Sequence, residues 1–129
     1  MPRSARTALA VAAALLATAP ATTPASAASC SIRATLKAPN HSPRANKDWW
    51  VTVTASPRIR THAKYQFLFN DRVVSTQYVL YDRNYAFTGH FRDPLKFPKR
   101  ATGLPLTLRV VLTNRCGTRN LDWKVKVRP

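Results

Sequence analysis

The sequence predicts an all-β domain built from about seven short antiparallel strands, and two observations favour this class. Apolar residues recur at every second position over most of the chain after residue 30. Pro, Asn, Asp or Gly residues separate these alternating segments at short intervals. Helical spacing of apolar residues is nowhere convincing. The pattern covers about 100 residues, the length of one domain.

The expected strands follow from this alternation. The alternating segments lie at 32–38, 49–55, 64–69, 72 onward, 85–91, 106–113 and 121–128. Asn70 and Asp71 favour a tight hairpin turn, because both residue types tolerate positive φ. Residues 78–84 mix apolar and polar side chains, and we interpret them as a short strand or bend followed by a turn. The residues 92–94, Arg-Asp-Pro, break the alternation and lead into a crossing connection that ends at Gly103.

Most aromatic residues lie at positions that this alternation turns inward, so we expect them to pack in the core. They are Tyr65, Phe67, Phe69, Phe87, Phe91 and Trp123. Trp49 and Trp50 are adjacent, and neighbouring strand residues point to opposite faces. One of the two is therefore predicted to be exposed. It either covers the edge of the domain or stacks on a sugar, and we favour the first interpretation.

About seven short strands with turn signals between them and one core Trp are typical of an immunoglobulin-like antiparallel β-sandwich. Three segments, 43–53, 65–69 and 105–111, resemble core strands of secreted immunoglobulin-like or fibronectin type III-like proteins of high-GC Gram-positive bacteria. The resemblance implies an accessory, adhesive or structural module rather than an enzyme, and it carries over no functional residues. The alternative fold is an OB-type barrel, which needs five longer strands and usually a helix.

The first 27 residues have the three parts of a secretory signal peptide. Arg3 and Arg6 precede an apolar run at 8–17, and residues 25–27, Ala-Ser-Ala, fit a cleavage site. The apolar run is too short to span a bilayer, and no later segment reaches the roughly 20 apolar residues of a transmembrane helix. We therefore expect a signal peptide at 1–27 and one domain at 28–129. The mature protein would be secreted, and surface contacts could hold it at the cell wall.

Two cysteines, Cys30 and Cys116, lie near the ends of the mature chain. In an oxidising compartment this pair predicts one disulfide, and closing a loop of about 85 residues contributes on the order of 4 kcal/mol. An immunoglobulin-like architecture brings the two together, because the start of the first strand lies near the loop that joins the last two. The alternative is a lipoprotein acylated at Cys30, although the usual Leu is missing at Ala27.

The charge balance points to anionic partners. The chain has 21 Lys and Arg against five Asp and no Glu, a formal net charge of +16. The mature part keeps 19 basic residues and the five Asp, or +14. Such a charge attracts polyanions and makes association sensitive to salt. For a secreted protein an anionic cell-wall polymer or an acidic polysaccharide is the expected partner, in preference to nucleic acid. The alternative is that the charge only keeps the domain soluble.

The outward basic positions are the candidate binding residues. We expect the last two strands to pair, the third strand to lie beside the sixth, and the first strand to lie against the seventh. One outer face then carries Lys64, Arg109, Lys124, Lys126 and Arg128, with Arg33 and Lys37 on its flank. Such a face suits a polymer recognised as a line of charge. The alternative is ordinary solvation, since Lys near an edge strand also discourages aggregation.

The sequence indicates neither an enzyme, nor a cofactor, nor a metal site. The histidines, His41, His62 and His90, lack metal-ligand spacing, and we expect both cysteines to be oxidised. The acidic residues fall mainly at expected turns and strand edges and form no recognisable catalytic pair; they are Asp48, Asp71, Asp82, Asp93 and Asp122. Two functional classes then stay open. The first is the polyanion-binding module, and the second is a protein-interaction module that uses loops or a sheet edge.

Overall fold

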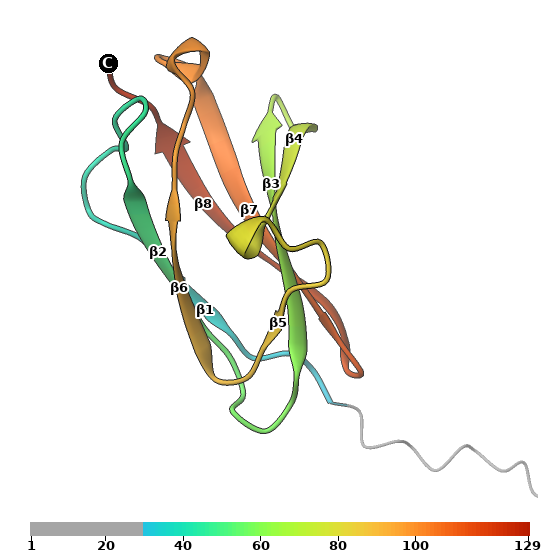
Figure 1. Ribbon diagram of the computed structural model, residues 1–129. Coiled ribbons are helices and arrows are strands. Elements are labelled where there is room, and N and C mark those ends of the chain that lie inside the picture. Colours follow the sequence, from blue (N-terminus) through green and yellow to red (C-terminus); the bar gives the residue numbers. More distant parts are fainter. Residues whose placement is uncertain (1–29) are drawn as a thin grey trace, which may run out of the picture.

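The computed structural model describes residues 30–129, so the expected signal peptide lies outside the described residues. These residues form two antiparallel β-sheets that pack face to face around one core, consistent with a β-sandwich (Figure 1). The eight strands are β1 Thr35–Lys37, β2 Trp49–Thr54, β3 Thr61–Phe69, β4 Arg72–Tyr78, β5 Ala86–Phe87, β6 His90–Leu95, β7 Pro105–Asn114 and β8 Gly117–Lys126. Two single-turn 3₁₀ helices, η1 Val79–Tyr81 and η2 Lys99–Ala101, lie between strands. No helix among residues 30–129 is long and apolar enough to cross a membrane.

The smaller sheet has the strand order β1-β2-β6. Its first strand is shorter than expected, because only residues 35–37 pair with β2. β6 corrects a second expectation, since it continues through Asp93 and Pro94 instead of ending there. Pro94 is tolerated because β6 is an edge strand, where a missing backbone N–H costs no ladder hydrogen bond on the open side.

The larger sheet has the order β4-β3-β7-β8, and β5 pairs with the start of β3. The β3–β4 hairpin turns at Asn70 and Asp71, whose φ values of 52° and 63° confirm the predicted positive-φ turn. The segment expected as one strand at 85–91 is divided between the two sheets. Gly89 lies at this crossing with a φ of 84°, in the left-handed region that favours glycine. The strand count is therefore eight instead of about seven.

The core lies between the two sheets and is formed by the inward residues of each strand. Its fully buried side chains include Trp49, Tyr65, Leu108 and Val110. Trp49 is buried and the neighbouring Trp50 is 40% exposed, as the alternation predicts. Trp50 lies on the central strand of the smaller sheet, so it covers a sheet face and not the edge of the domain.

The disulfide between Cys30 and Cys116 is confirmed, with Cα atoms 5.2 Å apart. Cys116 lies in the turn between β7 and β8, and Cys30 precedes β1 at the same end of the domain (Figure 1). The crosslink spans 86 residues. It therefore ties the start of the described chain to the β7–β8 turn, at the end of the domain opposite the C-terminus.

Candidate functional site

The larger sheet carries four of the predicted cations as expected, on its outer face. β3 pairs with β7, and β7 pairs with β8, which places Lys64, Arg109 and Lys124 on one side of the sheet. Lys126 continues the same alternation at the end of β8. Lys64 is only partly exposed. The cations follow a diagonal across the outer face, with one cation in each row of outward-facing residues. Successive outward rows lie about 7 Å apart.

Arg109 is not available as a free cation on this face. Its Nε and Nη2 donate to the two carboxylate oxygens of Asp122 at 2.8 and 3.0 Å, a bidentate pair across β7 and β8. The hydrogen bond from Arg109 lowers the pKa of Asp122, so this carboxylate stays charged at neutral pH. The pair interrupts the predicted line of positive charge at its middle.

The predicted flank of this face differs in the structure. β1 lies near β8, as expected, but it hydrogen-bonds to β2 in the smaller sheet and not to β8. Lys37 therefore lies on the outer face of the smaller sheet, and Arg33 is exposed just before β1. The period-two pattern predicted which residues point outward. It carries no information on which sheet the first strand joins, because pairing partners are set by contacts distant in sequence.

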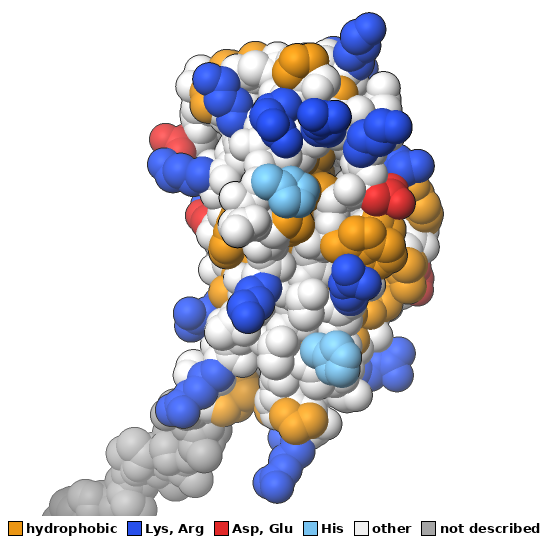
Figure 2. All heavy atoms as spheres, turned by 90° about the vertical axis from the view of Figure 1, so that its left-hand side faces the viewer, with side chains coloured by type: hydrophobic (Ala, Val, Ile, Leu, Met, Phe, Trp, Pro, Cys, Tyr) orange, Lys and Arg blue, Asp and Glu red, His pale blue; other side chains and the backbone are white. Residues whose placement is uncertain are grey.

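A different group of cations gathers at the end of the domain where the C-terminus lies. We call this group the basic end; its exposed members are Arg44, Lys47, Lys99, Arg100, Lys126 and Arg128. Figure 2 shows a row of Lys and Arg side chains across this end. Asp48, which follows Lys47, is paired with Lys96 at 3.8 Å.

Backbone hydrogen bonds hold the three segments of the basic end together. Ala45 N–H donates to Arg128 O at 2.9 Å, and Arg128 N–H donates to Pro43 O at 2.8 Å. Asn46 N–H donates to Phe97 O at 2.8 Å, and Gly103 N–H donates to Val127 O at 2.9 Å. These bonds join the loop before β2, the connection after β6 and the chain end after β8. Parallel bridges between loops have no periodic sequence signal, which is why the alternation missed this site.

The basic end rests on buried aromatic rings. Trp49 packs edge-on against Phe97 with ring centroids 5.9 Å apart, and Phe97 packs edge-on against Phe67 at 5.3 Å. Trp49 Nε1 also donates to His41 O at 3.0 Å, which anchors the loop before β2. The backbone that carries the cations is therefore fixed from below by the core.

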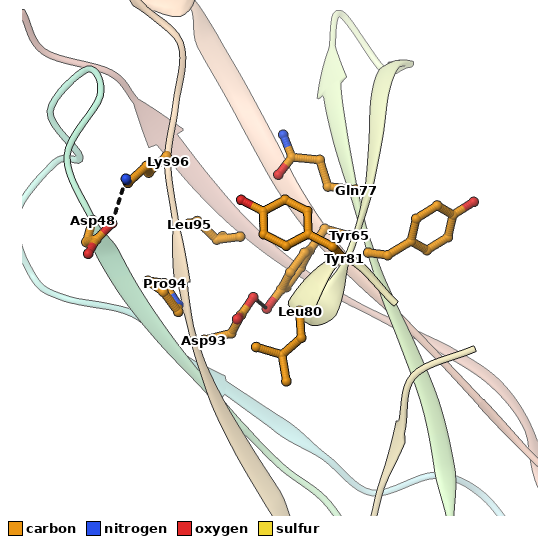
Figure 3. Close-up of a pocket in the computed structure, with 10 residues that line it drawn as sticks. Asp48, Tyr65, Gln77, Leu80, Tyr81, Asp93, Pro94, Leu95 and Lys96 are labelled. Carbon is orange, nitrogen blue, oxygen red and sulfur yellow. Dashed lines mark hydrogen bonds and ion pairs between the residues drawn. The ribbon is translucent and has the colours of Figure 1, made fainter. Parts of the chain in front are cut away.

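A pocket of about 580 Å³ opens on one side of the domain, between β6 and the segment formed by β4 and η1. Its lining includes Tyr65, Gln77, Leu80, Tyr81 and Asp93. Figure 3 shows the Tyr65 hydroxyl directed at the Asp93 carboxylate, with Leu80 beside them. The Tyr65 hydroxyl donates to Asp93 Oδ2 at 2.9 Å.

Asp93 departs from the expected role of the acidic residues, since it lies within β6 and is only 5% exposed. Burial raises the pKa of Asp93, and the hydrogen bond from Tyr65 partly offsets this by lowering it. Burial also raises the pKa of Tyr65, and the nearby Asp93 charge and hydrogen bond raise it further. The alternation of apolar and polar residues could not predict this hydrogen-bonded pair, because its members lie 28 residues apart in the sequence.

The outer face of the smaller sheet carries Trp50 with a cation stacked on it. The Arg92 guanidinium carbon lies 4.3 Å from the centroid of the Trp50 ring, within the range of a cation–π interaction. Arg92 and Trp50 lie on neighbouring strands. The guanidinium thus covers one face of the ring, which leaves that face closed to a stacked sugar.

The fold and these sites define an all-β, disulfide-linked domain with one strongly basic end and one lateral pocket. Among residues 30–129, no three His, Cys, Asp or Glu side chains are close enough together to hold a metal ion. Comparisons with protein-family models, with curated protein sequences and with solved structures found no match.

Proposed function

We propose that this chain is a secreted, non-catalytic binding module of immunoglobulin-like fold that associates with an anionic polymer of the cell envelope. The leader-like first 27 residues support secretion, and the disulfide is of the kind that persists in oxidising compartments. Two antiparallel sheets packed face to face around one core support the immunoglobulin-like class. The polymer binds at the basic end.

The single observation that carries this proposal is the convergence of six exposed cations from three segments of the chain at one end of the domain. Nearby acidic charge is small, because Asp48 is paired with Lys96. Cations on a fixed backbone lose less freedom on binding than cations on a mobile tail. A row of cations of this kind suits a flexible chain of phosphate or carboxylate groups, which is recognised by charge.

The proposal differs from the sequence-based hypothesis in the place of the binding surface. On the predicted sheet face Arg109 is paired with Asp122, and Lys37, expected beside this face, lies on the smaller sheet. Lys126 and Arg128 are shared by the predicted set and the basic end. The partner class, an anionic cell-wall polymer or acidic polysaccharide, stays as the sequence suggested it.

The test compares two variants that lose the same charge. The first changes four residues of the basic end to Gln: Arg44→Gln, Lys99→Gln, Arg100→Gln and Arg128→Gln. The second changes four predicted residues outside it: Arg33→Gln, Lys37→Gln, Lys64→Gln and Lys124→Gln. Binding of each to polyglycerol phosphate is measured by calorimetry over a salt titration.

We expect the basic-end variant to lose most of its affinity. The slope of log affinity against log salt should fall by roughly 0.7 to 0.9 for each phosphate contact removed. The second variant should bind almost as wild type. Equal losses in the two variants would mean that net charge alone drives binding, and the assignment to the basic end would then fail.

A second candidate function is binding of a protein partner at the free edge of β4. Val73 and Val74 are both about half exposed on this strand, and the strand's outer backbone groups are unpaired within the larger sheet. Binding of envelope extracts that survives high salt and is lost in Val74→Lys would favour this function.

A further inference from the structure

The lateral pocket contains none of the six cations of the basic end, and its lining includes the carboxylate of a largely buried residue, Asp93. Asp93 is only 5% exposed, and its hydrogen-bond partner Tyr65 is fully buried. Asp93 Oδ2 accepts the Tyr65 hydroxyl, while Oδ1 has no hydrogen-bond partner among the described residues. Oδ1 is accessible to solvent through the pocket, since Thr102 Oγ1 is the one buried side-chain oxygen or nitrogen without a partner among residues 30–129. The carboxylate lines the pocket, so a bound ligand can donate to Oδ1 in place of solvent.

The rim of the pocket carries backbone strain. Leu80 and Tyr81 have φ values of 52° and 58°, two consecutive non-glycine residues in the left-handed region. The turn is closed by the Asp82 N–H, which donates to Val79 O at 3.0 Å. Strained backbone of this kind is concentrated at ligand sites, where the surrounding structure maintains it.

The strain holds two large apolar side chains in solvent. Leu80 is 62% exposed and Tyr81 is 99% exposed, although both line the pocket. Val79 between them and β4 is fully buried and fixes the segment to the core. Exposed apolar groups beside a polar pocket are typical of a surface that a ligand covers. The neighbouring Tyr78 ring already has the Arg83 guanidinium near it, at 5.7 Å, so Tyr81 is the free aromatic group.

The polar groups of the pocket are mixed in type, which restricts the ligand. Asp93 accepts, Lys96 donates, and the Gln77 amide does both. A simple cation needs acceptors only, and an anion needs donors only. Hydroxyl groups donate and accept at once, and a sugar ring also has an apolar face that stacks on an aromatic side chain. A neutral ligand is also not repelled by the basic domain.

We propose that this pocket binds a neutral saccharide, with a sugar hydroxyl donating to Asp93 and a sugar face stacked on Tyr81. Gln77 and Lys96 contact further hydroxyl groups at the upper edge of the pocket in the view of Figure 3. The domain then has two separate sites, one for charge at its end and one for a sugar on its side. The second site does not depend on the first.

The test is a titration of the ¹⁵N-labelled, oxidised domain with two neutral trisaccharides, chitotriose and cellotriose, followed by NMR. Saturable shifts at the backbone amides of Gln77, Tyr81 and Asp93 with at least one of them are expected. Choline chloride serves as a separate arm for an amine ligand. Saturation by choline and not by either sugar would overturn the proposal, and so would the absence of saturable shifts with both sugars.

Variants assign the binding to this pocket. Tyr81→Ala removes a fully exposed ring and should weaken the sugar about tenfold, the effect of one aromatic stacking contact. Asp93→Asn keeps an acceptor for Tyr65 but removes the charged acceptor for the sugar, and it should also weaken binding. Val73→Ala, an exposed apolar change outside the pocket lining, is the matched control and should have no effect. Sugar binding unchanged in Tyr81→Ala and Asp93→Asn would refute the assignment.

The two proposals fail separately. The four-fold Gln variant of the basic end should bind the trisaccharide as wild type does. The Tyr81→Ala variant should bind polyglycerol phosphate as wild type does.

Discussion

Removal of the Tyr65 hydroxyl should destabilise the domain in a pH-dependent way. Tyr65→Phe leaves the ring in the core but removes the hydroxyl that donates to Asp93. The largely buried carboxylate of Asp93 then has no protein donor. A hydrogen bond to a charged group contributes about 1.5 to 3 kcal/mol, and a neutral one contributes about 1 kcal/mol. We therefore expect a loss of about 2 kcal/mol in the free energy of unfolding at pH 7.

The sign of the pH dependence follows from Asp93. Burial raises the folded-state pKa of Asp93 above the ordinary value of 3.8, so the buried charge opposes folding at neutral pH and this cost disappears as the pH falls toward 3.8. The Tyr65 hydrogen bond lowers the same pKa, so it favours the charged form. Its contribution is largest above the folded-state pKa and shrinks once Asp93 is protonated. Tyr85 is a further titratable group near this carboxylate, and Asp48, Tyr78, Tyr81 and Lys96 line the same pocket.

The assay is urea unfolding of wild type, Tyr65→Phe and Asp93→Asn at pH 7 and at pH 3.8. The difference between wild type and Tyr65→Phe should shrink to about 1 kcal/mol or less at the lower pH. Asp93→Asn should be as stable as wild type or more stable at pH 7, because it removes a buried charge and keeps an acceptor. Equal destabilisation by Tyr65→Phe at both pH values would refute this account of the pair.

Three further predictions test other parts of the fold. The double variant Cys30→Ser, Cys116→Ser should lose on the order of 4 kcal/mol of stability in urea, and a loss below about 1 kcal/mol would show that the crosslink constrains the unfolded chain little. Trp49→Ala should cost about 3 to 5 kcal/mol in the same assay, while Trp50→Ala should cost about 1 kcal/mol, so equal losses would contradict the assignment of the inner face. Asp122→Asn should free Arg109 yet leave polyglycerol phosphate affinity unchanged in calorimetry, and a clear gain would return the binding surface to the larger sheet.

The fold class could be predicted because each strand has its own local signal. The alternation at 106–113 and 121–128 is strong, and a strand forms at each. β7 matches its expected range closely, whereas β8 begins at Gly117, four residues early, and ends at Lys126. The Asn70-Asp71 turn follows from residue type alone. The weak points were the first strand, which has no signal for its partner, and 85–91, where one continuous pattern hides a crossing between sheets at Gly89.

The candidate sites were harder to predict, since both depend on contacts between distant segments. Period-two patterning showed that Lys64, Arg109 and Lys124 point outward, but not that Asp122 lies opposite Arg109 and pairs with it. Arg44 and Arg128 meet only through parallel bridges between irregular segments. The sequence indicated a turn at Asp93, because Pro94 follows it. An edge strand tolerates a proline, but the sheet order that makes β6 an edge strand cannot be known from the sequence.

The most direct test of the central claim is co-sedimentation of the oxidised mature domain with Gram-positive cell wall. Intact wall and wall stripped of teichoic acid are compared across a salt titration, with wild type and the four-fold Gln variant of the basic end. We predict that wild type sediments with intact wall at low salt and is released by salt, by stripping and by the Gln variant. Sedimentation that survives stripping, salt and the loss of these four cations would contradict a charge-driven envelope module.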